Sequence, residues 1–260
     1  MHSMKKRIRK YLPKWVIVIH RAIFRARLVW PEYIRYYMEC ISGKSVYARV
    51  TMRLKKTCLG AHDGEWCVAE DLLPGKPVVL SFGIGTDISW DLDMIKQYNA
   101  EVFAFDPTSI CLKWLANKDL PEAFKMIPLG IAQEDGEVEF GLPEGHSVSF
   151  SIDHNGKNQR VEKCEVRTFQ SLVRPLSITA VDVLKLDIEG TEYQVLEDIL
   201  NSEMPISQIL IEFHHRLFDD GVLMTKNALQ LLERKGYRLF YRSPRGLEFC
   251  FAKQNRVLRK

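Results

Sequence analysis

Long apolar segments are missing from this chain of 260 residues. The apolar run WVIVIH at 15–20 lies between Lys14 and Arg21 and falls far short of the roughly 18–20 residues that a membrane span requires. No small-residue cleavage pattern follows it, which argues against a secretion signal. We therefore expect a cytoplasmic protein that at most sits peripherally on a membrane.

Cysteine motifs are also lacking. The six cysteines form no C-x-x-C pair and no dense framework, so neither a zinc site nor a disulfide scaffold is expected. The simplest interpretation is reduced, mostly buried thiols. Disorder is excluded as well, because 46% of the residues are hydrophobic and 27% are charged, as in ordinary globular proteins.

The charge is unevenly distributed along the chain. Residues 1–56 hold 15 Lys and Arg and two acids, a net charge of +13, whereas the other 22 basic and 31 acidic residues give −9. The pattern predicts a basic arm over 1–52 and an acidic body over 53–260.

An amphipathic helix is predicted within the arm. Over 14–30 the tryptophans and aliphatic residues fall on one side at helical spacing, and Pro31 is expected to limit the helix. This face can dock on its own domain or on a twin subunit, which would make a homo-oligomer. The basic face with tryptophans also suits an anionic membrane surface. No recognised binding module surrounds the basic residues, so no specific nucleic acid is expected.

From residue 77 onward, strand and helix patterns alternate. Buried parallel strands are indicated by apolar runs at 77–85, 100–107, 124–132, 181–190 and 207–215. Helical patterns follow at 86–98, 108–118, 191–202 and 225–237. Turn signals between short alternating runs predict a β-rich insertion over 133–176, and two last strands around 244–246 predict an antiparallel hairpin. The fold class is therefore α/β with a mostly parallel sheet.

Glycines and an aspartate follow the first two strands. Gly83 and Gly85 come after the first strand, where they allow a sharp turn and a close approach of backbone to a ligand. The third glycine of the dinucleotide fingerprint is absent, since position 88 is isoleucine, so a group smaller than a pyrophosphate is expected. Asp106 ends the second strand and can accept hydrogen bonds from ribose hydroxyls, although it can also cap the following helix.

Acids and a histidine follow the two later strands. Asp187 and Glu189 can orient a substrate hydroxyl, accept a proton or hold a divalent cation, or they can cap the helix at 191–202. Alternation places Glu212 and His214 on one face. A histidine beside a cleft is a natural general base near neutral pH, although it can also simply pair with a nearby carboxylate.

These segments together resemble a known family. The order SFGIG, FAFDP, PLGIAQEDGEVEF, VDVLKLDIEGTEYQVL and ILIEFH is similar to that of FkbM-type S-adenosylmethionine-dependent methyltransferases. The likeness covers about residues 53–252, and residues 53–72 resemble a methyltransferase-like branch seen also in animals. The arm over 1–52 lies outside it.

The resemblance implies a class I methyltransferase fold, which is a Rossmann-like, seven-stranded sheet with an antiparallel last strand. It also implies S-adenosyl-L-methionine as the cofactor, and a sugar, a glycan or another small molecule as the acceptor of the methyl group on a hydroxyl. The implied cofactor-binding residues are Gly83, Gly85, Asp106, Pro107, Gly130, Ile131 and Asp187.

The resemblance also suggests the division of roles. Gly83 and Gly85 would pass under the methionine part of the cofactor, Asp106 would hold the ribose, and residues 130–132 would lie near the adenine. Asp187 would lie near the sulfonium and the acceptor. The catalytic candidates are His214 or the pair of Asp187 and Glu189 as the base, with a divalent cation as a further option.

One position departs from the pattern of class I enzymes. Many of them carry an acid two residues before the first glycine, where this chain has Ser81. Asp87 is the candidate to replace it.

Three other readings compete with the methyltransferase. A short-chain oxidoreductase using NAD needs Tyr-x-x-x-Lys, which is absent. Amino-methylating enzymes that act on nucleic acids carry a Pro-Pro-Tyr-type motif, and no two prolines are adjacent here. A non-catalytic cofactor-binding or membrane-adaptor protein with the same fold stays open, because it would retain the glycine loop.

Overall fold

The computed structural model describes residues 29–61, 65–141 and 161–254. The chain divides into two compact units, one of Met1–Tyr47 with Pro244–Gly246 and one of Ala48–Ser243 with Leu247–Lys260. The boundary thus falls at residue 47 instead of the predicted 52. The reason is local, because the amides of Thr51 and Met52 donate to the carbonyl of Leu239 and so join this segment to the larger unit.

The smaller unit contains a helix over residues 29–41. The prediction that Pro31 limits the helix is wrong, because the helix continues ten residues beyond it. Proline disturbs the turn that precedes it and leaves the following residues free to be helical. The rest of the predicted helix, residues 14–28, lies outside the described residues. Among the described helices, none is both long and apolar enough to cross a membrane.

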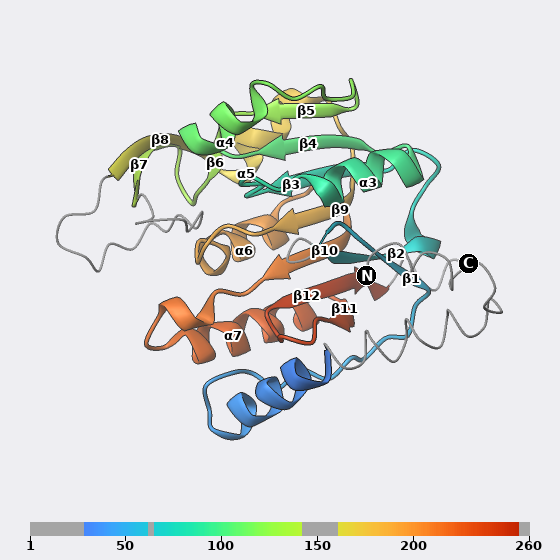
Figure 1. Ribbon diagram of the computed structural model, residues 1–260, viewed down its shortest axis with the longest axis vertical. Coiled ribbons are helices and arrows are strands. Elements are labelled where there is room, and N and C mark those ends of the chain that lie inside the picture. Colours follow the sequence, from blue (N-terminus) through green and yellow to red (C-terminus); the bar gives the residue numbers. More distant parts are fainter. Residues whose placement is uncertain (1–28, 62–64, 142–160, 255–260) are drawn as a thin grey trace, which may run out of the picture. The chain divides into compact units, whose positions relative to one another are not determined.

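The larger unit is built on a seven-stranded sheet (Figure 1). In chain order its strands are β3 (Val78–Phe82), β4 (Glu101–Phe105), β5 (Phe124–Ile127), β9 (Val181–Leu186), β10 (Ile206–Glu212), β11 (Tyr237–Arg242) and β12 (Glu248–Lys253). Their spatial order is β11-β12-β10-β9-β3-β4-β5. Only β12 runs antiparallel to its neighbours, so the predicted sheet and the C-terminal hairpin are confirmed.

Helices cover both faces of this sheet. They are α3 (Ser89–Tyr98), α4 (Ser109–Leu115), α5 (Phe169–Val173), α6 (Glu192–Asn201) and α7 (Gly221–Arg234). Buried residues of α5, α6 and α7 form one apolar cluster with one face of the strands, and those of α3 and α4 form a second cluster on the other face. A parallel sheet buried on both faces explains why its strands are continuous apolar runs. Short 3₁₀ helices are η2 (Glu70–Leu72), η3 (Arg174–Leu176) and η4 (His215–Leu217).

The predicted strand over 124–132 is divided in two. Its first part is β5, and its second part, β6 (Gly130–Ile131), joins a separate sheet in the order β6-β8-β7 with β7 (Gly136–Gly141) and β8 (Val161–Arg167). Pro128 lies between the two parts and has no N–H to continue a ladder. The predicted insertion over 133–176 is therefore β-rich at β7 and β8 but helical from Phe169 onward, and its residues 142–160 lie outside the described residues.

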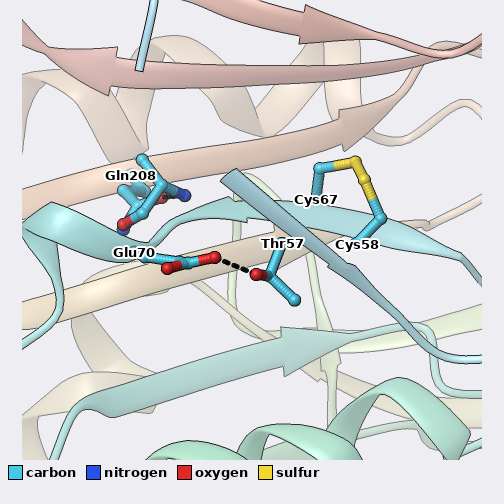
Figure 2. Close-up of a disulfide and its surroundings, with 6 residues drawn as sticks. Thr57, Cys58, Cys67, Glu70 and Gln208 are labelled. Atoms are coloured by element: carbon cyan, nitrogen blue, oxygen red, sulfur yellow. Dashed lines mark hydrogen bonds between the residues drawn. A yellow bond between two sulfur atoms is a disulfide. The ribbon is translucent and has the colours of Figure 1, made fainter. Parts of the chain in front are cut away.

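A hairpin of β1 (Lys56–Leu59) and β2 (Trp66–Ala69) precedes the sheet. Figure 2 shows the Cys58–Cys67 disulfide that joins the two strands, and the hydrogen bond from Thr57 to Glu70 beside it. The prediction of reduced thiols is therefore wrong for this pair. Antiparallel pairing sets Cys58 directly opposite Cys67, a proximity that the spacing of nine residues does not reveal. The other four cysteines are free.

Candidate active site

The carboxyl ends of the central strands bring the predicted site residues together. Gly83 follows β3, and its amide donates to the carbonyl of Phe105 at the end of β4, 2.9 Å away. The amide of Asp187, which follows β9, donates to the carbonyl of Phe82 at 3.1 Å. Three adjacent strands therefore end at one level, where open α/β sheets bind their ligands.

Gly83 is required by a close approach of two backbone segments. Its φ is +72°, and a Cβ placed there would lie 1.6 Å from the carbonyl oxygen of Asp187. No side chain fits at that distance. Gly85 has a φ of +51°, but a Cβ there would meet no atom within 4 Å. The first glycine thus sets the contact between the β3 and β9 loops, and the second borders open space.

Asp106 joins the first two loops. Its Oδ2 accepts from the amide of Gly85 at 2.9 Å, and its Oδ1 accepts from the amide and the hydroxyl of Thr108 at 2.9 and 2.6 Å. A carboxylate has about four acceptor sites, so one stays available to a ligand hydroxyl. Asp106 therefore has a structural function in addition to the predicted ribose contact, and Thr108 is the cap of α4.

Pro107 and Gly130 also lie together. A Cβ on Gly130 would come within 3.2 Å of the Pro107 ring and 2.9 Å of the Val166 side chain. Ile131 beside it is 4% exposed and belongs to the core. The structure brings the predicted adenine segment to the end of β4, but its buried side chains leave mainly backbone for a ligand to contact.

The catalytic candidates form a compact charged cluster. The Nε2 of His214 lies 3.8 Å from Asp187 Oδ1 and 3.4 Å from Glu189 Oε2. Glu189 has a φ of +51°, which is uncommon for a residue other than glycine. Phe213 is fully buried, whereas Glu212 and His214 on either side of it are partly exposed, in agreement with the predicted alternation.

Glu192 is a site residue that the sequence did not reveal. It is fully buried at the start of α6. Its Oε1 accepts from the amide of His214 at 2.8 Å and lies 3.2 Å from the ring Nδ1, and its Oε2 accepts from the amide of Gly190 at 2.8 Å. This carboxylate therefore orients the imidazole and joins the loops that follow β9 and β10. The only signal was an acid in the first turn of a helix, which ordinary helices also show.

The charge state of His214 follows from these neighbours. Burial by itself would lower the pKa of His214, but the hydrogen bond and charge of Glu192, with the charges of Glu189 and Glu212, outweigh burial and raise it to about 10. In this arrangement His214 is an imidazolium at neutral pH. Its Nδ1 is then hydrogen-bonded to Glu192, and its Nε2 faces Asp187 and Glu189 as an ion pair. Asp187 and Glu189 are the candidates for the base, since a protonated imidazole cannot accept a proton.

The same cluster contains a donor set for a metal ion. One ligand atom each of Asp187, Glu212 and His214 lies within 4.8 Å of the others. Carboxylates with one imidazole suit a divalent cation. A ligating histidine must be neutral, however, so metal binding would compete with the proton that Glu192 stabilises on His214. The divalent cation therefore stays a prediction.

The strand order, the single antiparallel strand and the loops at the carboxyl ends define a class I methyltransferase fold. Residues 59–239 match the family model described as the methyltransferase FkbM domain. The chain belongs to this family, as the motifs indicated.

Individual relatives are distant. The hexuronic acid methyltransferase AglP of Haloferax volcanii is 23% identical over 137 residues, which are 49% of this chain and 56% of AglP. The chain thus spans little more than half the length of this relative. Among solved structures, the fibrillarin pre-rRNA processing protein of Methanococcus jannaschii is 14% identical, with 70% of this chain and 69% of that chain covered and a TM-score of 0.42. Fibrillarin of Aeropyrum pernix, described with natively bound S-adenosyl-L-methionine, is 10% identical over 78% and 83%, with a TM-score of 0.39. The fold assignment rests on the strand order instead of these scores.

Proposed function

We propose that this protein transfers a methyl group from S-adenosyl-L-methionine to a hydroxyl of a sugar or glycan. The observation that carries the proposal is the position of Asp187. Its backbone touches the glycine loop at Gly83, and its carboxylate faces the imidazole of His214. Membership of the FkbM family supports methyl transfer, and the name of AglP supports a sugar acceptor.

The residues fit this cofactor in three respects. Gly83 and Gly85 leave backbone without side chains at the end of β3. Asp106 keeps one acceptor site for a ribose hydroxyl, as described above. The carboxylates of Asp187 and Glu189 supply negative charge that favours a positively charged sulfonium.

The mechanism follows from the same groups. The cofactor, when bound, supplies a methyl group on a positively charged sulfur that leaves readily. The protein aligns the acceptor and removes its proton. We propose that Asp187 or Glu189 takes the proton of the acceptor hydroxyl, and that His214, held by Glu192, orients both carboxylates.

The substitution Asp106→Ala tests the cofactor site. Loss of a hydrogen bond to a charged group should weaken S-adenosyl-L-methionine binding about 10- to 100-fold, measured by calorimetry. Asp119→Ala, at an exposed position, is the control and should bind normally. Absence of binding by the wild-type protein would contradict the proposal. Normal binding without methyl transfer to any sugar acceptor would instead favour the non-catalytic cofactor-binding protein.

We further propose that the arm attaches the enzyme to an anionic membrane surface. The described helix supports this proposal, because its exposed residues recur at helical spacing. They are Trp30, Ile34, Tyr37, Met38 and Ile41, with exposed fractions of 64, 54, 44, 64 and 88%. An apolar stripe with amphipathic aromatics beside a strongly basic sequence suits a lipid headgroup region.

Vesicle sedimentation of the full-length protein tests the attachment. The protein should bind phosphatidylserine–phosphatidylcholine vesicles and be released by salt. The double variant Trp30→Ser with Ile41→Ser should lose at least about tenfold in partition. Leu223→Ser, an exposed apolar position on α7, is the control. A different result would support the homo-oligomer instead. In that case the protein would bind no vesicles at any salt concentration, and size exclusion would show a dimer that the double variant dissociates.

The disulfide bears on the cellular location that we propose. The Cys58–Cys67 disulfide favours an oxidising compartment and argues against the expected cytoplasm, where thiols are kept reduced. Thiol alkylation of the protein in its native cells, followed by mass spectrometry, would distinguish the two.

A further inference from the structure

Lys185 is a buried cation between two loops of the candidate active site. Its side chain is 6% exposed, and it lies beside Ser81 in the β3–β9 register. Its Nζ is 3.5 Å from the carbonyl oxygen of Gly83 and 3.7 Å from Asp187 Oδ2. A buried ammonium costs free energy unless negative groups surround it. Both of these groups belong to the loops that we assign to cofactor and acceptor.

Asp91 is a second buried titratable residue, on the helix that follows the glycine loop. It lies in α3 and is 1% exposed, and its Oδ1 accepts no hydrogen bond from any described residue. Burial raises the pKa of Asp91 to about 6, while the charge of Lys185 opposes that rise. The positive charge of Lys185 therefore favours the charged form of the Asp91 carboxyl.

Ser81, the serine that departs from the class I pattern, is fully buried beside Lys185. Asp87 was the sequence-based candidate to replace the missing acid, but its Oδ1 accepts from the amide of Ser89 at 2.8 Å, at an exposed position before α3. Asp91, one turn further along, is buried, but neither its Oδ1 nor the Ser81 hydroxyl has a hydrogen-bond partner among the described residues.

The ring of Trp66 lies close to the ammonium. The ring centroid of Trp66 lies 5.1 Å from the Lys185 Nζ, and Trp66 is 2% exposed. An aromatic face attracts a cation, and the exclusion of water strengthens the field between Lys185 and Asp187. The disulfide-linked hairpin β1–β2 holds Trp66 in this place.

We propose that Lys185 is a positioning residue, which holds the Gly83 carbonyl and the Asp187 carboxylate in one fixed relation, with Asp91 as its internal counter-charge. The inference deepens the proposed methyl transfer and rests on it for the catalytic readout. Its structural part, the coupling between Lys185 and Asp91, can be measured without any ligand.

Thermal unfolding of single and double variants measures this coupling. Lys185→Met leaves Asp91 buried without its compensating charge and should lower the Tm by about 10 °C. The double variant Lys185→Met with Asp91→Asn removes both charges and should recover most of that loss. Lys113→Met, at an exposed position on α4, should leave the Tm unchanged. Additive losses in the double variant would overturn the pairing.

Kinetics of the same variants separates positioning from stability. Both variants that carry Lys185→Met should keep a kcat about 100-fold below wild type, although the double variant regains its Tm, and Lys185→Arg should restore part of the activity. Recovery of kcat together with the Tm would reduce Lys185 to a structural residue and overturn the proposal. If the wild-type protein itself fails to bind S-adenosyl-L-methionine, the proposed function is wrong, whereas the Tm result still decides the pairing.

Discussion

The substitution Glu192→Gln is expected to lower kcat about 100-fold while the protein still folds. The amide of glutamine matches the carboxylate in shape but carries no charge, and one of its two ends is a donor. It can therefore no longer accept from both Gly190 and His214. The imidazole loses the partner that fixes its ring, and its Nε2 no longer faces Asp187 and Glu189 in one orientation. Steady-state kinetics with saturating cofactor measures the loss.

The pH dependence of stability gives a second readout of the same contact. A pKa of about 10 in the folded protein lies above the value of about 6.5 in an unfolded chain. His214 therefore contributes stability that is complete below about pH 6.5 and is lost as the pH rises through about 10. The Tm of the wild type should fall across this interval. In Glu192→Gln the pKa of His214 in the folded protein should be lower, so the fall should be smaller and should end at a lower pH.

Glu197→Gln is the matched control, because Glu197 is exposed on the same helix. It should change neither kcat nor the pH profile of the Tm. Glu192→Asp keeps the charge on a shorter side chain and should retain more activity than Glu192→Gln. A Glu192→Gln enzyme with a normal kcat and an unchanged pH profile of the Tm would show that Glu192 contributes only to helix α6.

The sequence predicted those strands and helices whose own residues form a recognisable hydrophobic pattern. Apolar runs indicated the parallel strands, because a strand buried on both faces needs no alternation. The hairpin of β1 and β2 gave no comparable signal, since its four-residue strands are shorter than a periodicity can establish. The Cys58–Cys67 disulfide in the same hairpin depends on the register of these strands and was missed with it. The strand predicted over 124–132 was too long because Pro128 divides it.

The sequence predicted candidate site residues that follow the strands, but not those within a strand or a helix. Asp106, Asp187 and His214 follow their strands directly, where the topology of an open sheet places ligands. Glu192 and Lys185 lie within a helix and within a strand, positions that usually serve packing. Their roles depend on contacts across the sheet that only the folded chain creates. The sequence therefore indicated the candidate residues at the strand ends and missed the buried residues that contact them.

The substitution Gly83→Ala is expected to have the largest effect on stability. A Cβ at this position would lie 1.6 Å from the Asp187 carbonyl oxygen, and a backbone atom cannot move away as a flexible side chain can. The β3 and β9 loops must separate, at a cost of about 4 kcal/mol or more. The Tm should fall by about 10 °C or more, and binding of S-adenosyl-L-methionine by the remaining folded protein should be lost.

Gly85→Ala separates steric space from backbone conformation. Its φ of +51° makes alanine unfavourable by about 1 kcal/mol, but no protein atom lies within 4 Å of the added Cβ, so the Tm should fall only slightly. Gly136→Ala, which also meets no atom within 4 Å and has no positive φ, is the control for the substitution itself. If the open space at Gly85 is where the cofactor binds, Gly85→Ala will lose affinity by calorimetry without a comparable loss of Tm. Equal losses of Tm in Gly83→Ala and Gly85→Ala would instead mean that backbone conformation, and not the contact with Asp187, determines the loop.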